Sequence, residues 1–185
     1  IILMGCDSPG STVILAEPVL YRVDAEDLAT SAEADISRML PAEVVRHIDG
    51  DTVVVRIAHP PPELQTQETI RMIGVDTPET VHPNKPTQPF GPEASAFTKE
   101  QLLGKQVYLA FDWDLRDRYG RLLAYLYIIE EIEKREEARV GTCFNTRLIR
   151  EGYAYAYRYF AFQFMEEFTD LEQAAREAKR GLWGL

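Results

Sequence analysis

The chain has 185 residues, 45% of them apolar, and a formal net charge of −10 at pH 7. This length and apolar share suit one globular domain with an added segment, and no run of 18 or more apolar residues is present that would cross a bilayer as a helix. The acidic balance argues against tight binding to bulk nucleic acid through a basic face, so any binding of a polyanion is expected to be weak, salt-sensitive and assisted by a metal ion.

Residues 1–41 are predicted to form a tether or helical extension outside the main domain. The opening IILMGCDSPGS places an apolar stretch and Gly5 before Cys6, an order that resembles the end of a bacterial lipoprotein signal. In that interpretation the chain is an exported bacterial protein, either extracellular or held at a membrane as a lipoprotein. Cys6 would then carry the lipid anchor. An ordinary buried apolar segment is the alternative. Residues 24–40 have the pattern of one amphipathic helix.

Residues 42–185 are predicted to form a single α+β domain. Five β-rich runs, EVVRHI, TVVVRIA, ETIRMIGV, KQVYLAFDW and LLAYLYII, predict a five-stranded OB-fold-type antiparallel β-barrel. Helix start and stop signals predict three α-helices. These run from Pro92 to Leu103, from Asn145 as N-cap to Gly152 with Leu148 and Ile149 facing the barrel, and from Thr169 or Asp170 to Gly181.

Two aspartates lie at the ends of predicted strands. Asp51 begins the second strand after the Asp49-Gly50 turn, and Asp76 ends the third strand just before Pro78 leads the chain out of β-structure. Antiparallel neighbours can bring these positions together at one end of the barrel, where two carboxylates suit a hard divalent cation. Each motif alone is more often structural, as a hairpin turn or a loop cap.

Two arginines and a glutamate accompany these aspartates. Arg71 lies on an otherwise apolar side of its strand, and Arg121 follows the turn at Gly120; a structural salt bridge and an exposed turn residue are the ordinary interpretations. Glu79 is an additional carboxylate, or else a solvated loop residue. Phosphodiester hydrolysis needs a cation, a base for water and guanidinium groups for the charge of the transition state, and this set supplies those residue types.

The motifs IDGDT, TIRMIGVDTPET, GPEASAFTK, RYGRLLAYLY and LIREGYA occur in an order and at spacings that resemble the staphylococcal-nuclease (thermonuclease) family, over about residues 44–183. The resemblance implies an OB-fold barrel and a Ca²⁺-dependent endonuclease that hydrolyses phosphodiester bonds of single-stranded or frayed DNA and RNA, leaving 3′-phosphate ends. A monomer is expected. The alternative from another class is a catalytically inactive OB-fold module that binds nucleic acid or protein; the joint presence of the carboxylates and arginines argues against it.

The resemblance also implies a metal site. Asp51 and Asp76 would bind the ion through their side chains, Thr77 would bind it through its backbone carbonyl, and Asp49 would support these ligands without touching the ion. Glu79 would orient or deprotonate the attacking water.

A phosphate site is implied as well. Arg71 and Arg121 would bind the scissile phosphate and stabilise the transition state. Arg118 and Tyr119 would contact the terminal phosphate of a bound nucleotide, with Lys85 of the proline-rich loop assisting.

The aromatic run at 153–164 departs from the family pattern. Alternation places Tyr153, Tyr155, Tyr157 and Tyr159 on one side, as a surface on which bases could stack, with Tyr157 the preferred contact. Packing against the barrel is the alternative. The acidic segment 130–137 and the N-terminal 40 residues have no clear counterpart in the family.

Overall fold

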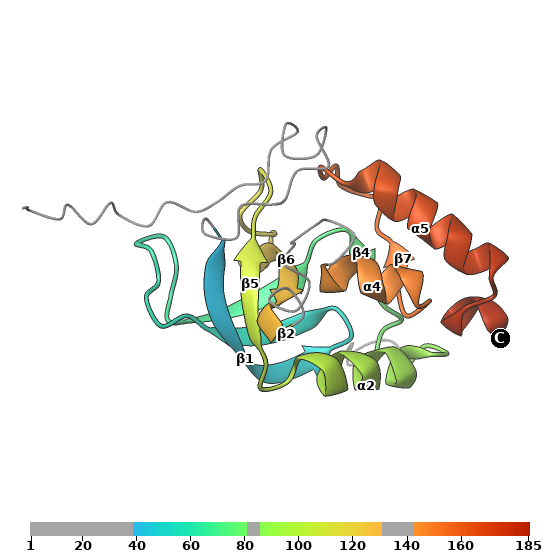
Figure 1. Cartoon of the computed structure of the whole chain (residues 1–185), viewed down its shortest axis with the longest axis horizontal. Helices are drawn as coiled ribbons and strands as arrows, with labels where there is room; N and C mark the ends of the chain where they lie inside the picture. Colours follow the sequence, from blue (N-terminus) through green and yellow to red (C-terminus); the bar gives the residue numbers. More distant parts are fainter. Residues whose placement is uncertain (1–38, 81–85, 131–142) are drawn as a thin grey trace, which may run out of the picture.

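The computed structural model describes residues 39–80, 86–130 and 143–185 (Figure 1). Five strands close into a barrel in the order β1-β2-β3-β6-β5, and helices pack around one side of it. For the described residues, the predicted α+β barrel of OB type with three α-helices is confirmed. The barrel strands are β1 (Leu40–Asp49), β2 (Thr52–Arg56), β3 (Gln67–Met72), β5 (Gln106–Ala110) and β6 (Leu122–Ile128), and the α-helices in the described ranges are α2 (Gly91–Leu102), α4 (Phe144–Arg150) and α5 (Met165–Glu177).

One strand pairing differs from the wholly antiparallel barrel that the sequence predicts. β3 and β6 run parallel, with Ile70 opposite Leu122, whereas the other neighbouring pairs in the barrel are antiparallel. A parallel pair requires a long crossover connection. The segment containing α2 and β5 provides it, so the barrel is mixed.

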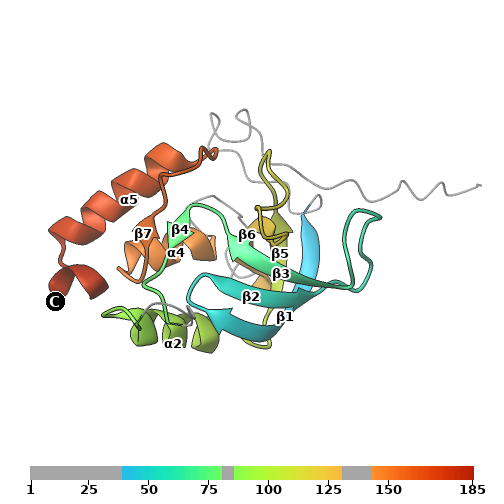
Figure 2. The same ribbon diagram turned by 180° about the vertical axis from the view of Figure 1, so that it is seen from behind.

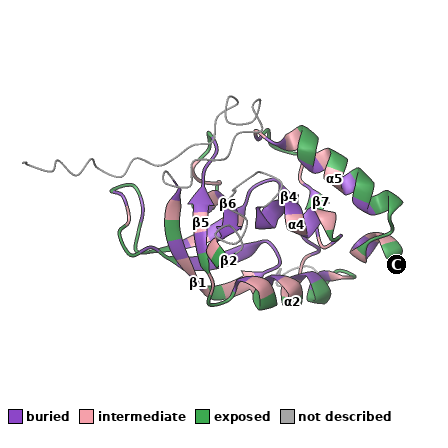
Figure 3. Cartoon of the chain, in the orientation of Figure 1, coloured by how far each residue is buried: buried purple, intermediate pink, exposed green. Residues whose placement is uncertain are grey.

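The core fills the barrel because alternate residues of its strands point inward. β1 pairs with β5 through its first residues and with β2 through its last ones. Its register shifts twice, between Val44 and Arg46 and between His47 and Asp49, and such irregularities let one strand bend around a barrel. Figure 3 shows burial concentrated in these strands. Fully buried core residues include Val44, Val53, Val55, Ile70, Leu109 and Leu126.

The third predicted strand is broken in two. β3 ends at Met72, Gly74 has a positive φ of 74°, and a separate short strand, β4 (Val75–Asp76), pairs with β7 (Tyr155–Ala156). A Cβ atom on Gly74 would lie 2.6 Å from the ring of Phe162, so both conformation and space favour glycine here. The break turns the chain away from the barrel directly before Asp76.

The helices stack outward from the barrel (Figures 1 and 2). α2 packs on β1, α4 packs on β6 and β4, and α5 packs on α4 and β7. A short 3-10 helix, η3 (Gly181–Gly184), follows α5. The third helix is predicted from Thr169 or Asp170 to Gly181, but α5 begins at Met165 and ends at Glu177, so both predicted ends lie too far along the chain. No helix within residues 39–80, 86–130 and 143–185 is long and apolar enough to span a membrane.

The prediction that Asn145 caps α4 is wrong. Cys143 occupies the N-cap position, while Asn145 is fully buried within the helix. Its Nδ2 donates to the carbonyls of Ile73 at 2.9 Å and Ala124 at 3.2 Å. Leu148 and Ile149 are fully buried against the barrel, as predicted.

Several predictions fall on residues outside the described ranges. These are the lipid anchor at Cys6, the phosphate contact of Lys85, the acidic segment after Glu130 and the helix at 24–40. The last residue of that helix, Leu40, is described, and it begins β1.

Candidate active site

The carboxylate of Asp51 is fixed at one end of the barrel. The residue lies in the turn between β1 and β2, one residue before the strand that it was predicted to begin, and exposes 8% of its surface. The hydroxyl of Thr52 donates to Oδ1 at 2.8 Å, and the backbone N–H and hydroxyl of Thr77 donate to Oδ2 at 3.1 and 3.2 Å. These three hydrogen bonds fix the orientation of the Asp51 carboxylate.

Gly50 makes this close approach of Asp51 and Thr77 possible. A Cβ atom at position 50 would lie 2.7 Å from the hydroxyl oxygen of Thr77, which is closer than real Cβ contacts. Glycine is therefore required at position 50 by the packing of Thr77, which follows β4, against the turn.

Arg71 joins the two aspartates that the sequence singled out. Its Nη1 lies 3.0 Å from Oδ2 of Asp51, and its Nη2 lies 3.1 Å from Oδ1 of Asp76. Nη1 also donates to the carbonyl of Val75 at 2.7 Å. The break between β3 and β4 is what turns Asp76 back toward Arg71. The side chains of Arg71 and Asp51 are 14% and 11% exposed, but that of Asp76 is 50% exposed, so the cluster opens to solvent on the Asp76 side.

The donor set fits a hard divalent cation. Two carboxylates and the adjoining backbone of Thr77 provide the oxygen ligands that Ca²⁺ and Mg²⁺ prefer, with room for water on the exposed side of Asp76. A guanidinium already lies between the carboxylates, which shows that this position accommodates positive charge. The described residues gather no group of three or more His, Cys, Asp or Glu side chains suited to a metal. Glu79 therefore does not form such a three-residue group with Asp51 and Asp76.

The loop that carries Glu79 is held at its base from two sides. The backbone N–H of Glu79 donates to Oε1 of Gln88, and the N–H of Gln88 donates to the carbonyl of Glu79, each at 2.9 Å. Asp49, which is buried, accepts hydrogen bonds from the hydroxyl of Thr80 at 2.5 Å and from its N–H at 3.3 Å. Asp49 therefore supports the neighbour of Glu79 rather than the aspartate pair directly.

Arg121 is oriented by the turn that precedes β6. Asp117 accepts from Nε of Arg121 at 2.7 Å and from its backbone N–H at 2.9 Å. Leu122, the next residue, lies opposite Ile70 in the parallel pair. Arg121 therefore directly precedes β6, the strand that pairs with the part of β3 carrying Arg71.

Arg118 and Tyr119 form one exposed unit at the tip of this turn. Nη2 of Arg118 donates to the phenolic oxygen of Tyr119 at 2.6 Å, and its guanidinium carbon lies 4.8 Å from the ring centroid. The guanidinium of Arg121 lies 5.4 Å from the same centroid. Tyr119 is 68% exposed, so the unit presents a ring and two cations to solvent.

The aromatic run divides between two sides. Tyr153 stacks on Phe97 of α2, with ring centroids 4.1 Å apart, so the prediction that all four tyrosines share one surface is wrong for Tyr153. Tyr157 lies on the active-site side, with its ring centroid 5.9 Å from the guanidinium carbon of Arg71. It lines a pocket together with Tyr155, Tyr159 and Asp76.

Two supporting residues were missed by reasoning from the sequence. Thr80 fixes the loop through Asp49, and Asp117 fixes Arg121 and also accepts from the N–H of Tyr119 at 2.9 Å. An aspartate two residues before a turn tyrosine is a usual Asx-turn signal, so Asp117 could have been found. Nothing in the local sequence indicates the partner of Thr80, because 31 residues separate it from Asp49.

Known proteins resemble this chain along most of its length. The family described as staphylococcal nuclease homologue matches residues 69–184. The thermonuclease of Staphylococcus hyicus is 40% identical over 142 residues, which are 76% of this chain and 74% of that protein. The thermonuclease of Staphylococcus intermedius is 42% identical over 113 residues, 61% of this chain and 57% of that protein. Endonuclease YncB of Bacillus subtilis is 32% identical over 166 residues, 88% of this chain and 71% of that protein.

These matches agree with the resemblance seen in the sequence motifs and with the mixed five-stranded barrel. They also cover the strands and helices that position Asp76, Arg71 and Arg121. The chain belongs to the staphylococcal nuclease family.

Proposed function

We propose that this protein is a Ca²⁺-dependent nuclease that hydrolyses phosphodiester bonds of DNA and RNA and leaves 3′-phosphate ends. The observation that supports this most directly is the cluster in which Arg71 contacts both Asp51 and Asp76. Two relatives are thermonucleases and a third is an endonuclease. Loss of the carboxylates would have favoured a binding module, and both are present.

The ion would be held by Asp51, Asp76 and the backbone carbonyl of Thr77. When bound, a hard divalent cation polarises the phosphate and offsets its charge. The ligand positions are partly preorganised, because hydrogen bonds from Thr52 and Thr77 hold the carboxylate of Asp51 in one orientation. The side chain of Asp76 remains half exposed, so an ion can reach it from solvent.

The arginines would act on the phosphate. Arg71 on β3 and Arg121, directly before β6, would donate N–H groups to its non-bridging oxygens and stabilise the charge that grows in the transition state. Asp117 holds Arg121 in orientation before substrate arrives. Such preorganisation is what makes donors effective in catalysis.

Glu79 would take the proton of the attacking water. Water oxygen forms the new bond to phosphorus, the bond from phosphorus to the 5′-oxygen breaks, and the 5′-oxygen receives a proton, so the phosphate remains on the 3′-oxygen. The hydrogen bonds to Gln88 and the Thr80–Asp49 contact hold the Glu79 backbone in place. The reaction needs no other co-reactant.

Substrate contacts would extend to both sides of this centre. Arg118 and Tyr119 would bind a terminal phosphate, with Lys85 assisting, and Tyr157 would stack on a base. Bases must be unpaired to reach such a ring, which favours single-stranded or frayed substrates.

The test is digestion of single-stranded DNA by the purified protein with Ca²⁺ and with a chelator, by the wild type and by Asp51→Asn and Glu79→Gln. We expect calcium-dependent cleavage leaving 3′-phosphate ends, and a loss of about a hundredfold or more in either variant. Glu100→Gln, an exposed change on α2, is the matched control and should retain activity. Calorimetry should show weaker calcium binding by Asp51→Asn. Folded wild-type protein that binds DNA without cutting it under any condition would favour the binding module instead.

A further inference from the structure

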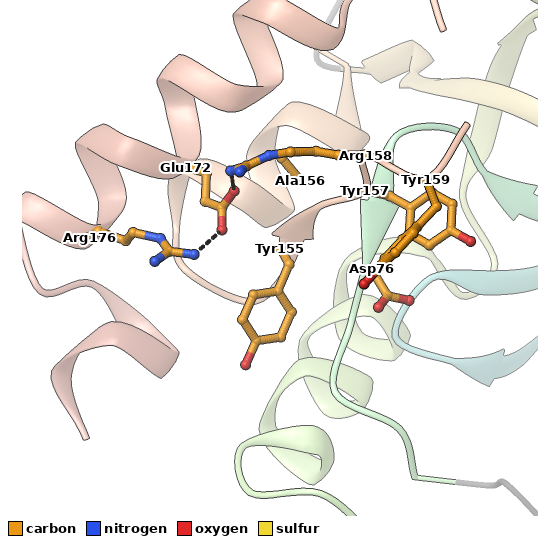
Figure 4. Close-up of a pocket in the computed structure, with 8 residues that line it drawn as sticks. All are labelled: Asp76, Tyr155, Ala156, Tyr157, Arg158, Tyr159, Glu172 and Arg176. Carbon is orange, nitrogen blue, oxygen red and sulfur yellow. Dashed lines mark hydrogen bonds and ion pairs between the residues drawn. The ribbon is translucent and has the colours of Figure 1, made fainter. Parts of the chain in front are cut away.

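A pocket of about 300 Å³ lies between β7 and α5 (Figure 4). At one end, Asp76 lies near Tyr157 and Tyr159, beside the candidate active site. At the other end, Glu172 of α5 lies between two arginine side chains. The pocket therefore leads from the proposed catalytic centre toward a second charged cluster that the proposed reaction does not use. Its lining consists of Asp76, Tyr155, Ala156, Tyr157, Arg158, Tyr159, Glu172 and Arg176.

The second cluster has more positive than negative charge. Glu172 is only 2% exposed, and its two oxygens accept from different guanidiniums. Arg176 donates to Oε1 at 2.6 Å, and Arg158 donates to Oε2. One guanidinium is enough to balance a buried carboxylate, so the cluster retains one net positive charge.

Both guanidiniums are accessible. The side chains of Arg158 and Arg176 are each 53% exposed. A guanidinium has five N–H donors, and the contact with Glu172 engages only one edge of each group. The remaining donors can reach an anion in or above the pocket.

Arg176 is also held in a fixed orientation. Its guanidinium carbon lies 3.9 Å from the ring centroid of Trp183. The rings of Trp183 and Tyr155 are nearly perpendicular, with their centroids 5.2 Å apart. A guanidinium stacked on a ring and bonded to a buried carboxylate loses little further freedom when it binds. The same planar fork matches the oxygens of a phosphate.

We propose that Arg158 and Arg176 form a second phosphate subsite, which binds the backbone of the substrate strand one step beyond the nucleotide at Tyr157. This inference rests on the proposed function and extends it. The strand would pass from the scissile phosphate near Asp76, along the tyrosines, to the two arginines on the far side of the pocket. In a chain of net charge −10, such a local excess of positive charge is what lets a polyanion follow this path.

The test compares a short and a long substrate. Thymidylyl-thymidine reaches the catalytic centre only, whereas single-stranded dodecathymidylate also spans the pocket. For Arg158→Gln and Arg176→Gln, each of which leaves one guanidinium on Glu172, we expect the ratio of kcat/KM for the long substrate to that for the short one to fall about tenfold. Arg46→Gln, an exposed change on β1, should keep the wild-type ratio.

A binding measurement separates this subsite from catalysis. Fluorescence anisotropy of labelled dodecathymidylate in chelator, over a series of salt concentrations, should give a log–log slope that is shallower by about 0.7 in each variant. Wild-type ratios and slopes in variants that melt normally would show that the arginines only neutralise Glu172, and would overturn the proposal. If the wild type cuts neither substrate but the variants still lose salt dependence, the proposed function fails and the subsite stands.

Discussion

Arg71 shows how a single side chain organises the candidate site. Arg71 is the only charged residue on its face of β3, which it shares with Gln67 and Thr69. The prediction that this face is otherwise apolar is wrong, because β3 ends at Met72 and does not include Ile73 or Val75. Its guanidinium contacts Asp51, Asp76 and the backbone at Val75. The sequence-based alternatives for Arg71, a salt bridge or a phosphate ligand, are therefore compatible, because a guanidinium paired with exposed Asp76 retains donors on its open side.

At the residue scale, the first prediction concerns Arg121. Arg121→Ala should lower kcat on single-stranded DNA by roughly a hundredfold, equivalent to about 3 kcal/mol of transition-state stabilisation. Arg121→Lys keeps the charge but loses the planar fork, so it should restore only a small part of this loss. Single-turnover kinetics with saturating Ca²⁺ would measure both variants. Arg46→Ala is the control, and an Arg121→Ala enzyme with near wild-type kcat would remove Arg121 from the mechanism.

At the scale of elements, α4 is joined to the barrel by a buried amide. Asn145 donates to Ile73 and Ala124 and accepts from the N–H of Leu126 at 3.0 Å. Ile73 follows β3 and the other two residues belong to β6, so the side chain links the ends of the parallel strand pair to the helix. The segment from Ile73 leads directly into Asp76. The position of that aspartate thus depends on α4 as well as on the barrel.

Replacing this amide should destabilise the protein. Asn145→Leu has a similar volume but leaves the carbonyl of Ile73 and the N–H of Leu126 without their partner, which should lower the free energy of unfolding by about 2 to 4 kcal/mol. Urea denaturation monitored by circular dichroism would measure it. Gln173→Leu, an exposed change on α5, should alter stability by no more than about 0.5 kcal/mol. Equal stability of the two variants would show that the amide bonds are dispensable.

At the scale of the whole molecule, one ion pair connects distant parts of the chain. Arg116 makes two contacts with the carboxylate of Glu68 on β3, at 2.6 and 2.9 Å, and it donates to the carbonyl of Gly120 at 2.9 Å. It therefore fastens the turn that carries Arg121 to the barrel. Burial by itself would raise the pKa of Glu68, but hydrogen bonds from Arg116 and from the backbone of Gln65 outweigh it and hold that pKa below its ordinary value of 4.5.

This pKa shift predicts how stability depends on pH. Because folding lowers the pKa of Glu68, its ionised form stabilises the fold above pH 4.5, and this stabilisation is lost as the pH falls through the folded-state pKa. Glu68→Gln should be less stable than the wild type near neutral pH by about 2 kcal/mol, and the difference should shrink on acidification below pH 4.5. Urea denaturation across this range would measure it, with Glu100→Gln as the control. A difference that stays constant with pH would show that the pair does not titrate in this way.

Much of the fold could be predicted because it depends on local patterns. Short β-rich runs predict the strands, Asp49-Gly50 predicts the first hairpin, and Gly104 predicts the end of α2, where its φ is 77°. These signals act over a few residues, so the order of strands and helices could be derived from them. The pairing of β3 with β6 could not be derived in this way. About 50 residues of crossover separate the two strands, and hydrophobic periodicity does not show which strands pair.

The sequence by itself determined the family, the barrel and the residue types at the candidate site, because motif spacing and hydrophobic periodicity are properties of the chain alone. Only the tertiary structure decided how Arg71 links Asp51 to Asp76, that Asn145 is a buried support rather than a cap, and that Tyr153 and Tyr157 face different neighbours. The physical reason is that these contacts join residues far apart in sequence. Their geometry is set by how β4, β7 and the helices pack around the barrel.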